Sequence, residues 1–380
     1  MMSRPHQLLK PALALVPALL VAACSNAPPA PAPLTEAALA AVTDKAGAPR
    51  DQLAREIDDL FTQEGLGETR AVVVMADGEL AAERYAPGYD KDTRFISWSM
   101  AKTVTGVLIG MLVADGLLSL DTPAPVEQWQ RPGDPRAEIT LRHLLQMRSG
   151  LRHVESGDPP YKSSEVRMLF LDGRDDMARW AREQPLEYEP GDKFVYSSNT
   201  SVILADIATN ALTRSKDPAT RARVMRDYLH ERLFGPLGMT SMVPEFDASG
   251  TLIGGSLMHA TARDWAKLGE FLRRKGRTPD GTQLVPSRWV EAMLTPSPRS
   301  PQYGFQIWLN RPIPGSDGQH PLFPERAPAS LFSLIGHMGQ YVLVSPEQGV
   351  TLVRLGHSDS KERPAMLQQA ADVLALYPVR

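Results

Sequence analysis

Short runs rich in apolar residues lie near both ends of the chain. Such runs are typical of strands when turn signals bound them. In each half, two such runs flank a turn signal, Asp77-Gly78 in the first and Pro346 to Gly349 in the second. The predicted strands are 70–75, 79–85, 340–344 and 350–355. We therefore expect one antiparallel sheet built from both chain ends.

Between these hairpins the apolar spacing is helical. The predicted helices are 36–63, 99–115, 141–147, 164–183, 200–212, 221–233, 261–275, 286–294 and 363–376. Residues 99–113 are apolar almost all round, which is typical of a buried central helix. The predicted class is α/β (α+β): an antiparallel sheet flanked by helices, within a globular domain over 36–380 that carries an inserted, mainly helical subdomain at about 116–300.

Composition excludes several classes of protein. The chain has 380 residues, 43% hydrophobic and 22% charged, which is enough to bury a large core. Its 41 basic and 44 acidic residues include no basic run, so a nucleic acid is not an expected partner. The single cysteine, Cys24, excludes an internal disulfide framework and a multi-thiol zinc site.

The N-terminus has the pattern of an export signal. A short basic region precedes the apolar run 11–23, which is too short to span a bilayer. The run ends in Leu-Val-Ala-Ala-Cys24, which resembles the lipobox of bacterial lipoproteins. It predicts a lipoprotein signal peptide over 1–23, then a lipidated Cys24 and a Pro/Ala tether over 24–35. The alternative is an ordinary signal peptide that leaves Cys24 as a chance thiol.

A lipidated Cys24 would hold the domain at the cell envelope, facing the periplasm. By resemblance to Gram-negative lipoproteins, Ser25 after the cysteine indicates the outer membrane.

A Ser-x-x-Lys segment opens the apolar helix. Residues three apart share a helix face, so the Lys102 amine can reach the Ser99 hydroxyl. Lysine acts as a base only when neutral, and burial together with the helix N-terminus is expected to lower its pKa. A second match, Ser358 to Lys361, lies in a polar stretch, and we interpret it as a chance match on a solvated loop.

Two further segments carry chemistry. Tyr196 lies in a loop before the helix from residue 200, where a phenol could relay a proton. Residues His337-Met338-Gly339-Gln340 begin a strand of the closing hairpin. A glycine there would let the substrate backbone approach, and the Gln340 N–H could join that of Ser99 in an oxyanion hole.

These three segments, in this order and spacing, resemble the serine β-lactamase and penicillin-binding-protein superfamily, in particular its class C, esterase and 6-aminohexanoate-dimer-hydrolase-like branch. The resemblance covers about 63–380 and implies a β-lactamase/transpeptidase-like fold. It implies that Ser99 is the acyl-forming nucleophile, Lys102 its base and Tyr196 the proton relay. It also implies that the N–H groups of Ser99 and Gln340 hold the oxyanion. No metal and no organic cofactor are called for.

Two departures from the family pattern bear on the substrate. His337 stands where β-lactamases usually carry the lysine of Lys-Thr-Gly, and a histidine is mostly neutral at pH 7. Ser198 stands where Tyr-x-Asn has its asparagine. With Gly339, these residues are the expected substrate-binding positions. The departures match relatives that cleave esters or small amides, so we expect a serine hydrolase acting on such molecules through an acyl-enzyme.

Two alternatives stay open. One is a β-lactamase or D,D-peptidase acting on β-lactams or peptidoglycan peptides, and the other is a catalytically silent envelope-binding module of the same fold. The aromatic residues Trp98, Tyr303 and Trp308 could shape an acyl pocket or belong to the core.

Overall fold

The computed structural model describes residues 1–2, 33–315 and 320–380. The chain divides into two units, 1–33 and 34–380, and the second carries the fold. The predicted signal peptide beyond residue 2, Cys24 and most of the tether lie outside the described residues. Within the described ranges, no helix combines the length and the apolar character needed to cross a bilayer.

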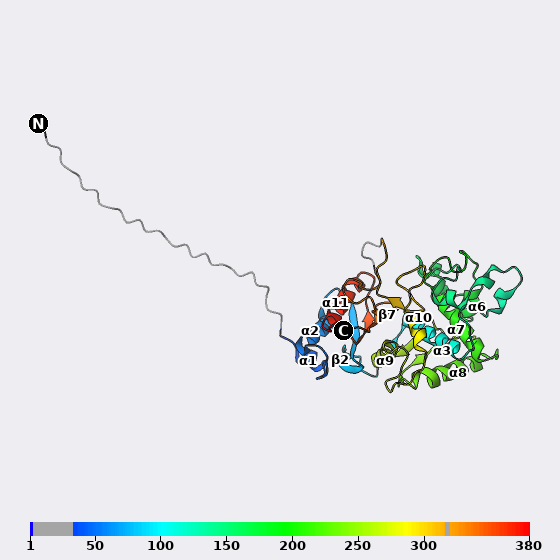
Figure 1. The fold of residues 1–380 in the computed structure, drawn as a ribbon, viewed down its shortest axis with the longest axis horizontal. Coiled ribbons are helices and arrows are strands. Elements are labelled where there is room, and N and C mark those ends of the chain that lie inside the picture. The colour runs from blue at the N-terminus through cyan, green and yellow to red at the C-terminus, as the bar shows by residue number, and fades with distance from the viewer. Residues whose placement is uncertain (3–32, 316–319) are drawn as a thin grey trace. The chain divides into compact units, whose positions relative to one another are not determined.

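A six-stranded antiparallel sheet forms one half of the second unit (Figure 1). Its strand order is β2-β1-β9-β8-β7-β6. The strands are β1 (Glu68–Ala76), β2 (Glu79–Tyr85), β6 (Trp308–Leu309), β7 (Phe332–Gly336), β8 (Gln340–Ser345) and β9 (Val350–His357). The predicted sheet from both chain ends is confirmed, because β1 pairs with β9 along its whole length, with Val73 opposite Val353.

Each face of this sheet packs against helices. Val72 and Val74 of β1 join the core cluster beneath α2 (Arg50–Thr62) and α11 (Arg363–Ala375). Ala71 and Val73 join the cluster that contains α9 (Ala262–Arg273). Successive residues of a strand point to opposite faces, so a strand covered on both sides is apolar throughout.

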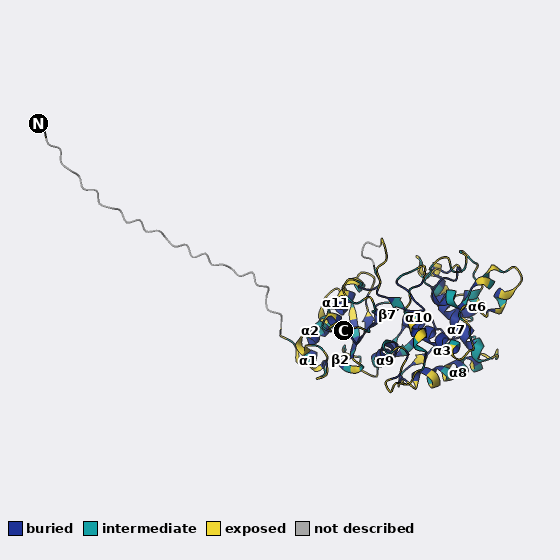
Figure 2. Ribbon diagram, viewed as in Figure 1, coloured by how far each residue is buried: buried dark blue, intermediate teal, exposed yellow. Residues whose placement is uncertain are grey.

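The other half of the unit is mainly helical and surrounds α3 (Ala101–Ala114), on which every residue from 101 to 112 is buried (Figure 2). The remaining α-helices are α1 (Glu36–Ala40), α4 (Leu141–Leu145), α5 (Ser164–Phe170), α6 (Met177–Arg182), α7 (Ser198–Leu212), α8 (Pro218–Leu229) and α10 (Ser287–Met293). The shorter turns are η1 (Trp98–Met100), η2 (Glu127–Gln130), η3 (Pro135–Glu138), η4 (Pro160–Lys162) and the π-helical η5 (His230–Phe234). A small sheet has the order β3 (Phe95–Ile96), β5 (Met258–Ala260), β4 (Val243–Pro244).

Three predicted elements were wrong in extent. The helix expected over 36–63 is two helices separated by residues 41–49, where Gly47 has a left-handed φ of 71° that an α-helix does not contain. The helix expected over 164–183 divides into α5 and α6 around Gly173, where an added Cβ would lie 2.8 Å from Met168 Cα. Residues 337–339 do not begin a strand; they form the tight turn between β7 and β8.

Candidate active site

Ser99 lies in η1, at the start of the buried helix α3. Its neighbour Trp98 has φ 44°, a left-handed conformation that is strained for a bulky side chain. The turn also lies close against β7, since a Cβ on Gly336 would be 2.4 Å from the Ser97 carbonyl oxygen. Strand and helix together hold the Ser99 segment from two sides.

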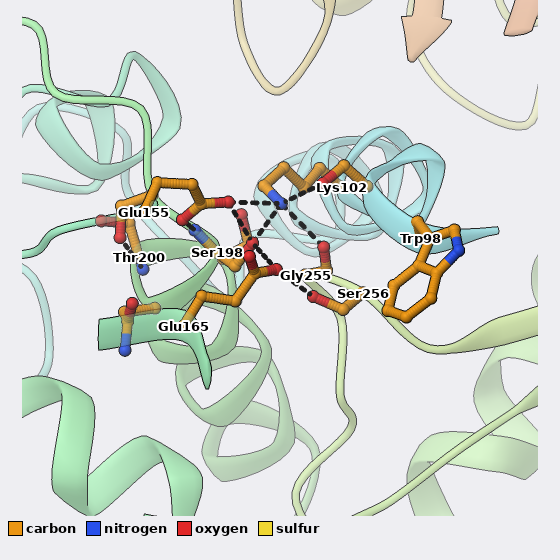
Figure 3. Close-up of polar contacts among 12 residues, drawn as sticks. Trp98, Lys102, Glu155, Glu165, Ser198, Thr200, Gly255 and Ser256 are labelled. Carbon is orange, nitrogen blue, oxygen red and sulfur yellow. Dashed lines mark hydrogen bonds and ion pairs between the residues drawn. The ribbon is translucent and has the colours of Figure 1, made fainter. Parts of the chain in front are cut away.

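Lys102 is almost fully buried one turn further on and points back to Ser99. Its Nζ lies 2.9 Å from Ser99 Oγ, 2.7 Å from Ser198 Oγ and 2.7 Å from the Gly255 carbonyl oxygen (Figure 3). An ammonium group has three N–H donors, and these three oxygens accept one each. The structure therefore brings Lys102 to Ser99, as the motif spacing predicted, and adds a contact with Ser198 that the sequence did not predict.

Two glutamates that sequence reasoning missed complete this cluster. Glu155 Oε1 lies 2.6 Å and Glu165 Oε1 lies 2.8 Å from Ser198 Oγ. The backbone N–H of Ser198 donates to Glu155 Oε2 at 2.7 Å, and Ser256 Oγ donates to Glu165 at 3.2 Å. Figure 3 shows both carboxylates directed at Ser198 beside the Lys102 amine. No motif marks them, because Glu155 comes from a polar loop and Glu165 from the first turn of α5.

The pKa of Lys102 is shifted in the direction opposite to the one predicted. Burial lowers its pKa, but the opposing effect of Tyr196, Glu155 and Glu165 is larger, so that the pKa of Lys102 lies above its ordinary value. The expectation of a lowered pKa was wrong, because the sequence does not reveal the carboxylates. Burial also raises the pKa of Glu155 to about 7; Lys102 opposes this shift and Glu165 adds to it.

Tyr196 lies partly buried beside the amine. Its ring centroid lies 4.9 Å from Lys102 Nζ, and its hydroxyl interacts with both Ser99 and Lys102. The ring packs against Trp308 at 5.1 Å and Tyr303 at 5.7 Å between centroids, so those two aromatics serve as its support. Burial raises the pKa of Tyr196, so the side chain is a neutral phenol that can donate a proton.

Only part of the segment 337–340, the third of the predicted motifs, lies next to Ser99. The His337 ring contacts the Trp98 ring edge to face, with 5.6 Å between the ring centroids. Burial lowers the pKa of His337, so this side chain is neutral at pH 7. The space beside Gly339 is occupied by Arg354, whose Nη1 donates to the Gly339 carbonyl at 2.9 Å. Gln340 lies on the inner strand β8, and its side-chain Nε2 donates to the Gly356 carbonyl oxygen at 2.6 Å. The Gln340 N–H as oxyanion donor and Gly339 as a substrate contact stay predictions.

The second Ser-x-x-Lys match has no catalytic surroundings. Ser358 is buried and donates to the Leu66 carbonyl at 2.6 Å, whereas Lys361 is exposed. The interpretation as a chance match is thus supported. Within the part of the chain that the structure describes, no group of three or more His, Cys, Asp and Glu residues is placed to hold a metal ion.

Comparison with known proteins identifies the family. The Beta-lactamase family model matches residues 57–376. A curated relative, the 6-aminohexanoate-dimer hydrolase of Paenarthrobacter ureafaciens, is 25% identical over 261 residues, covering 64% of this chain and 62% of the relative's length. The chain therefore spans less than two thirds of that enzyme.

Solved structures share the fold. A protein of Bacillus anthracis, provisionally named a 6-aminohexanoate-dimer hydrolase, superposes with a TM-score of 0.64 at 22% identity, over 82% of this chain and 80% of that one. A D-stereospecific amidohydrolase from Streptomyces sp. superposes with a TM-score of 0.53 at 18% identity, over 78% of this chain and 92% of that one. With a Ser-x-x-Lys pair at the head of a buried helix and a sheet made by both termini, the chain belongs to the β-lactamase family, within the superfamily of serine β-lactamases and penicillin-binding proteins.

Proposed function

We propose that this protein is a serine hydrolase that cleaves ester or amide bonds of small molecules through an acyl-enzyme on Ser99. The observation that carries the proposal is the 2.9 Å contact between Ser99 Oγ and Lys102 Nζ at the start of α3, with the Tyr196 phenol beside both groups. A nucleophile within hydrogen-bond reach of a base is the arrangement that covalent catalysis needs.

In the proposed acylation, Lys102 first has to lose a proton, because its raised pKa favours the ammonium. Ser99 Oγ then attacks the carbonyl carbon and its proton passes to the neutral amine. The proton then reaches the leaving group by way of Tyr196, whose neutral phenol can donate one proton and take up another. Water afterwards releases the acyl group by the reverse transfers. The N–H groups of Ser99 and Gln340 are the proposed oxyanion donors.

Small esters and amides are preferred to β-lactams because of His337. Its lowered pKa keeps it neutral, so it supplies no permanent cation for the carboxylate of a β-lactam. The names of the similar hydrolases, one acting on an aminohexanoate dimer and one an amidohydrolase, agree with this preference. A β-lactamase or D,D-peptidase is the second candidate, and the name of the family model, Beta-lactamase, favours the first of these two activities.

The test compares hydrolysis of a short-chain nitrophenyl ester and a chromogenic cephalosporin by the wild type, Ser99→Ala and Lys102→Ala. The chain offers a matched control in Lys361→Ala, the exposed lysine of the second Ser-x-x-Lys segment. We expect ester turnover that both site variants abolish and the control retains. Undiminished turnover in Ser99→Ala would refute the proposal, and Ser99-dependent cephalosporin turnover would favour the second candidate.

We also propose that Cys24 is lipidated and anchors the domain at the periplasmic side of the cell envelope, in the outer membrane. The support is the Leu-Val-Ala-Ala-Cys24 pattern after an apolar run, followed by Ser25. Expression of Cys24→Ser in a Gram-negative host should move the protein from the membrane fraction to the soluble fraction. An unchanged distribution would refute the anchor.

A further inference from the structure

Two carboxylates lie against Ser198 and take no part in the acylation described above. We propose that Glu155 and Glu165 share one proton across Ser198 Oγ and thereby control Lys102: the amine can become a neutral base while the pair holds this proton and is locked as an ammonium once the pair loses it. The inference rests on the proposed function, because it takes Lys102 to be the base for Ser99.

Counting protons at Ser198 supports a shared proton. A hydroxyl has one hydrogen to donate and two lone pairs. Lys102 Nζ, 2.7 Å away, donates to one lone pair. The one hydroxyl hydrogen can reach only one of the two carboxylate oxygens, Glu155 Oε1 at 2.6 Å or Glu165 Oε1 at 2.8 Å. The other contact is a hydrogen bond only if that carboxyl carries a proton and donates it. The three contacts are therefore satisfied together by one proton on the pair.

The charge of the cluster leads to the same proton count. One ammonium group faces two partly buried carboxylates, and like charges this close disfavour double ionisation. With one proton on the pair, the cluster of Lys102, Glu155 and Glu165 is neutral. Burial raises the pKa of Glu155 to about 7, which is the direction that a retained proton requires.

The proton that Lys102 has to lose can follow the same contacts. Ser198 Oγ passes its hydrogen to the ionised carboxylate and takes one from Lys102 Nζ. The net result is that one N–H bond of Lys102 breaks and one O–H bond forms on the carboxylate. A cation and an anion become two neutral groups. The amine then turns about its Cε–Nζ bond, keeping N–H contacts with Ser198 Oγ and the Gly255 carbonyl, so that its lone pair faces Ser99 Oγ.

The other titratable groups that face the pair hold one charge state through the neutral range. Burial raises the pKa of Tyr196 on the loop before α7 and that of Tyr303 before β6, so both stay protonated. His337, in the turn after β7, has a pKa lowered by burial and stays neutral. The raised pKa of Lys102 keeps it protonated until its proton moves to the pair. A change of activity near neutral pH is therefore assigned to the pair.

The direction in which kcat/KM changes with pH tests the proposal. The neutral amine with both carboxyls protonated holds the same number of protons as the resting cluster, in which Lys102 is an ammonium and the pair holds one proton. Once the pair loses its shared proton, a second negative charge keeps Lys102 an ammonium, and the fraction of enzyme with the active proton count falls about tenfold per pH unit above the pKa of the pair. kcat/KM for the nitrophenyl ester should then fall at least about tenfold between pH 6 and pH 8.5. A lone lysine base gives the opposite result, a rise with pH as the amine deprotonates.

Glu165→Gln is the decisive variant, because it removes one charge while Glu155 keeps its contact with the Ser198 backbone N–H. We expect its kcat/KM to be flat from pH 6 to pH 8.5 and to exceed the wild-type value at the upper end. Glu245→Gln is the matched control: this glutamate contacts His259, is half exposed, and should leave the wild-type profile unchanged.

An infrared measurement keeps the test independent of turnover. The difference spectrum between wild type and Glu165→Gln at pH 6 should contain the C=O band of a protonated carboxylic acid, and the band should disappear from the wild type by pH 8.5. A rising wild-type profile, a falling profile kept in Glu165→Gln, or no such band would overturn the inference. In each case, Ser99-dependent ester turnover would leave the proposed function standing.

Discussion

Asp206 on α7 bridges two arginines and offers the sharpest test of what holds the helical half together. One carboxylate oxygen lies 2.8 Å from Arg182 Nη1 of α6 and the other lies 2.7 Å from Arg221 Nη2 of α8. The three side chains are only 11%, 15% and 8% exposed, so solvent screens them little. Asp206→Ala leaves two guanidinium groups facing each other without a counterion.

Breaking a buried ion pair by removing one partner costs about 3–5 kcal/mol. Arg221 keeps hydrogen bonds to Asn210 and Thr251, which places the expected loss of unfolding free energy for Asp206→Ala at the lower end of that range. With a urea dependence of about 3 kcal/mol per M, the unfolding midpoint should fall by about 1 M. The assay is urea unfolding followed by intrinsic tryptophan fluorescence and by circular dichroism, with coincident transitions required.

The matched control is Asp227→Ala, which removes an exposed i,i+4 pair with Arg223 at 3.7 Å on α8. Exposed pairs contribute about 0.5 kcal/mol or less, so this midpoint should hardly move. Adding Arg182→Met to Asp206→Ala should restore about 1 kcal/mol, because one unpaired cation is removed. If Asp206→Ala behaves like the control, the bridge does not stabilise the fold as argued.

Three further predictions concern the site. Gly255→Ala should lower kcat at least tenfold, because the added Cβ would lie 2.7 Å from the Ser198 carbonyl oxygen and would displace the Lys102 contacts. A thermal unfolding midpoint near that of the wild type would exclude simple unfolding as the cause. Tyr196→Phe should lower kcat/KM by about 10²-fold or more while the ring packing keeps the stability unchanged, and wild-type kinetics would contradict the relay. His337→Lys should lower KM for a cephalosporin while leaving KM for a neutral ester unchanged, and equal effects on both substrates would argue against an anion-binding role.

The sheet and the buried helix could be predicted because their patterns are local. The β1–β2 hairpin shows its turn as Asp77-Gly78, whose φ values of 51° and 91° belong to the left-handed region that these residue types favour. α3 shows its burial by a surface that is apolar almost all round. The 337–339 turn was missed because Met338 at φ 57° is not a usual turn residue, so the sequence continued to predict a strand there.

The site was predictable as far as spacing carries information. Ser99 and Lys102 share a helix face, so their contact follows from local geometry. The contact between Lys102 and Ser198 joins distant segments and depends on the tertiary structure. Glu155 and Glu165 were not predictable, since glutamates in polar stretches usually face water. Their burial depends on how residues 151–170 pack over the start of α7, which is a property of the tertiary structure.

The pairing of β1 with β9 has a consequence for biosynthesis. These two neighbouring strands are separated by more than 270 residues of sequence, from Ala76 to Val350. A nascent chain that has emerged only as far as β8 exposes an unpaired, apolar edge on β1, which is open to association with other chains. Contacts of such long range also slow folding. Release of the polypeptide before β9 should therefore yield aggregation-prone fragments rather than partly active enzyme, and chaperone demand should peak late in synthesis.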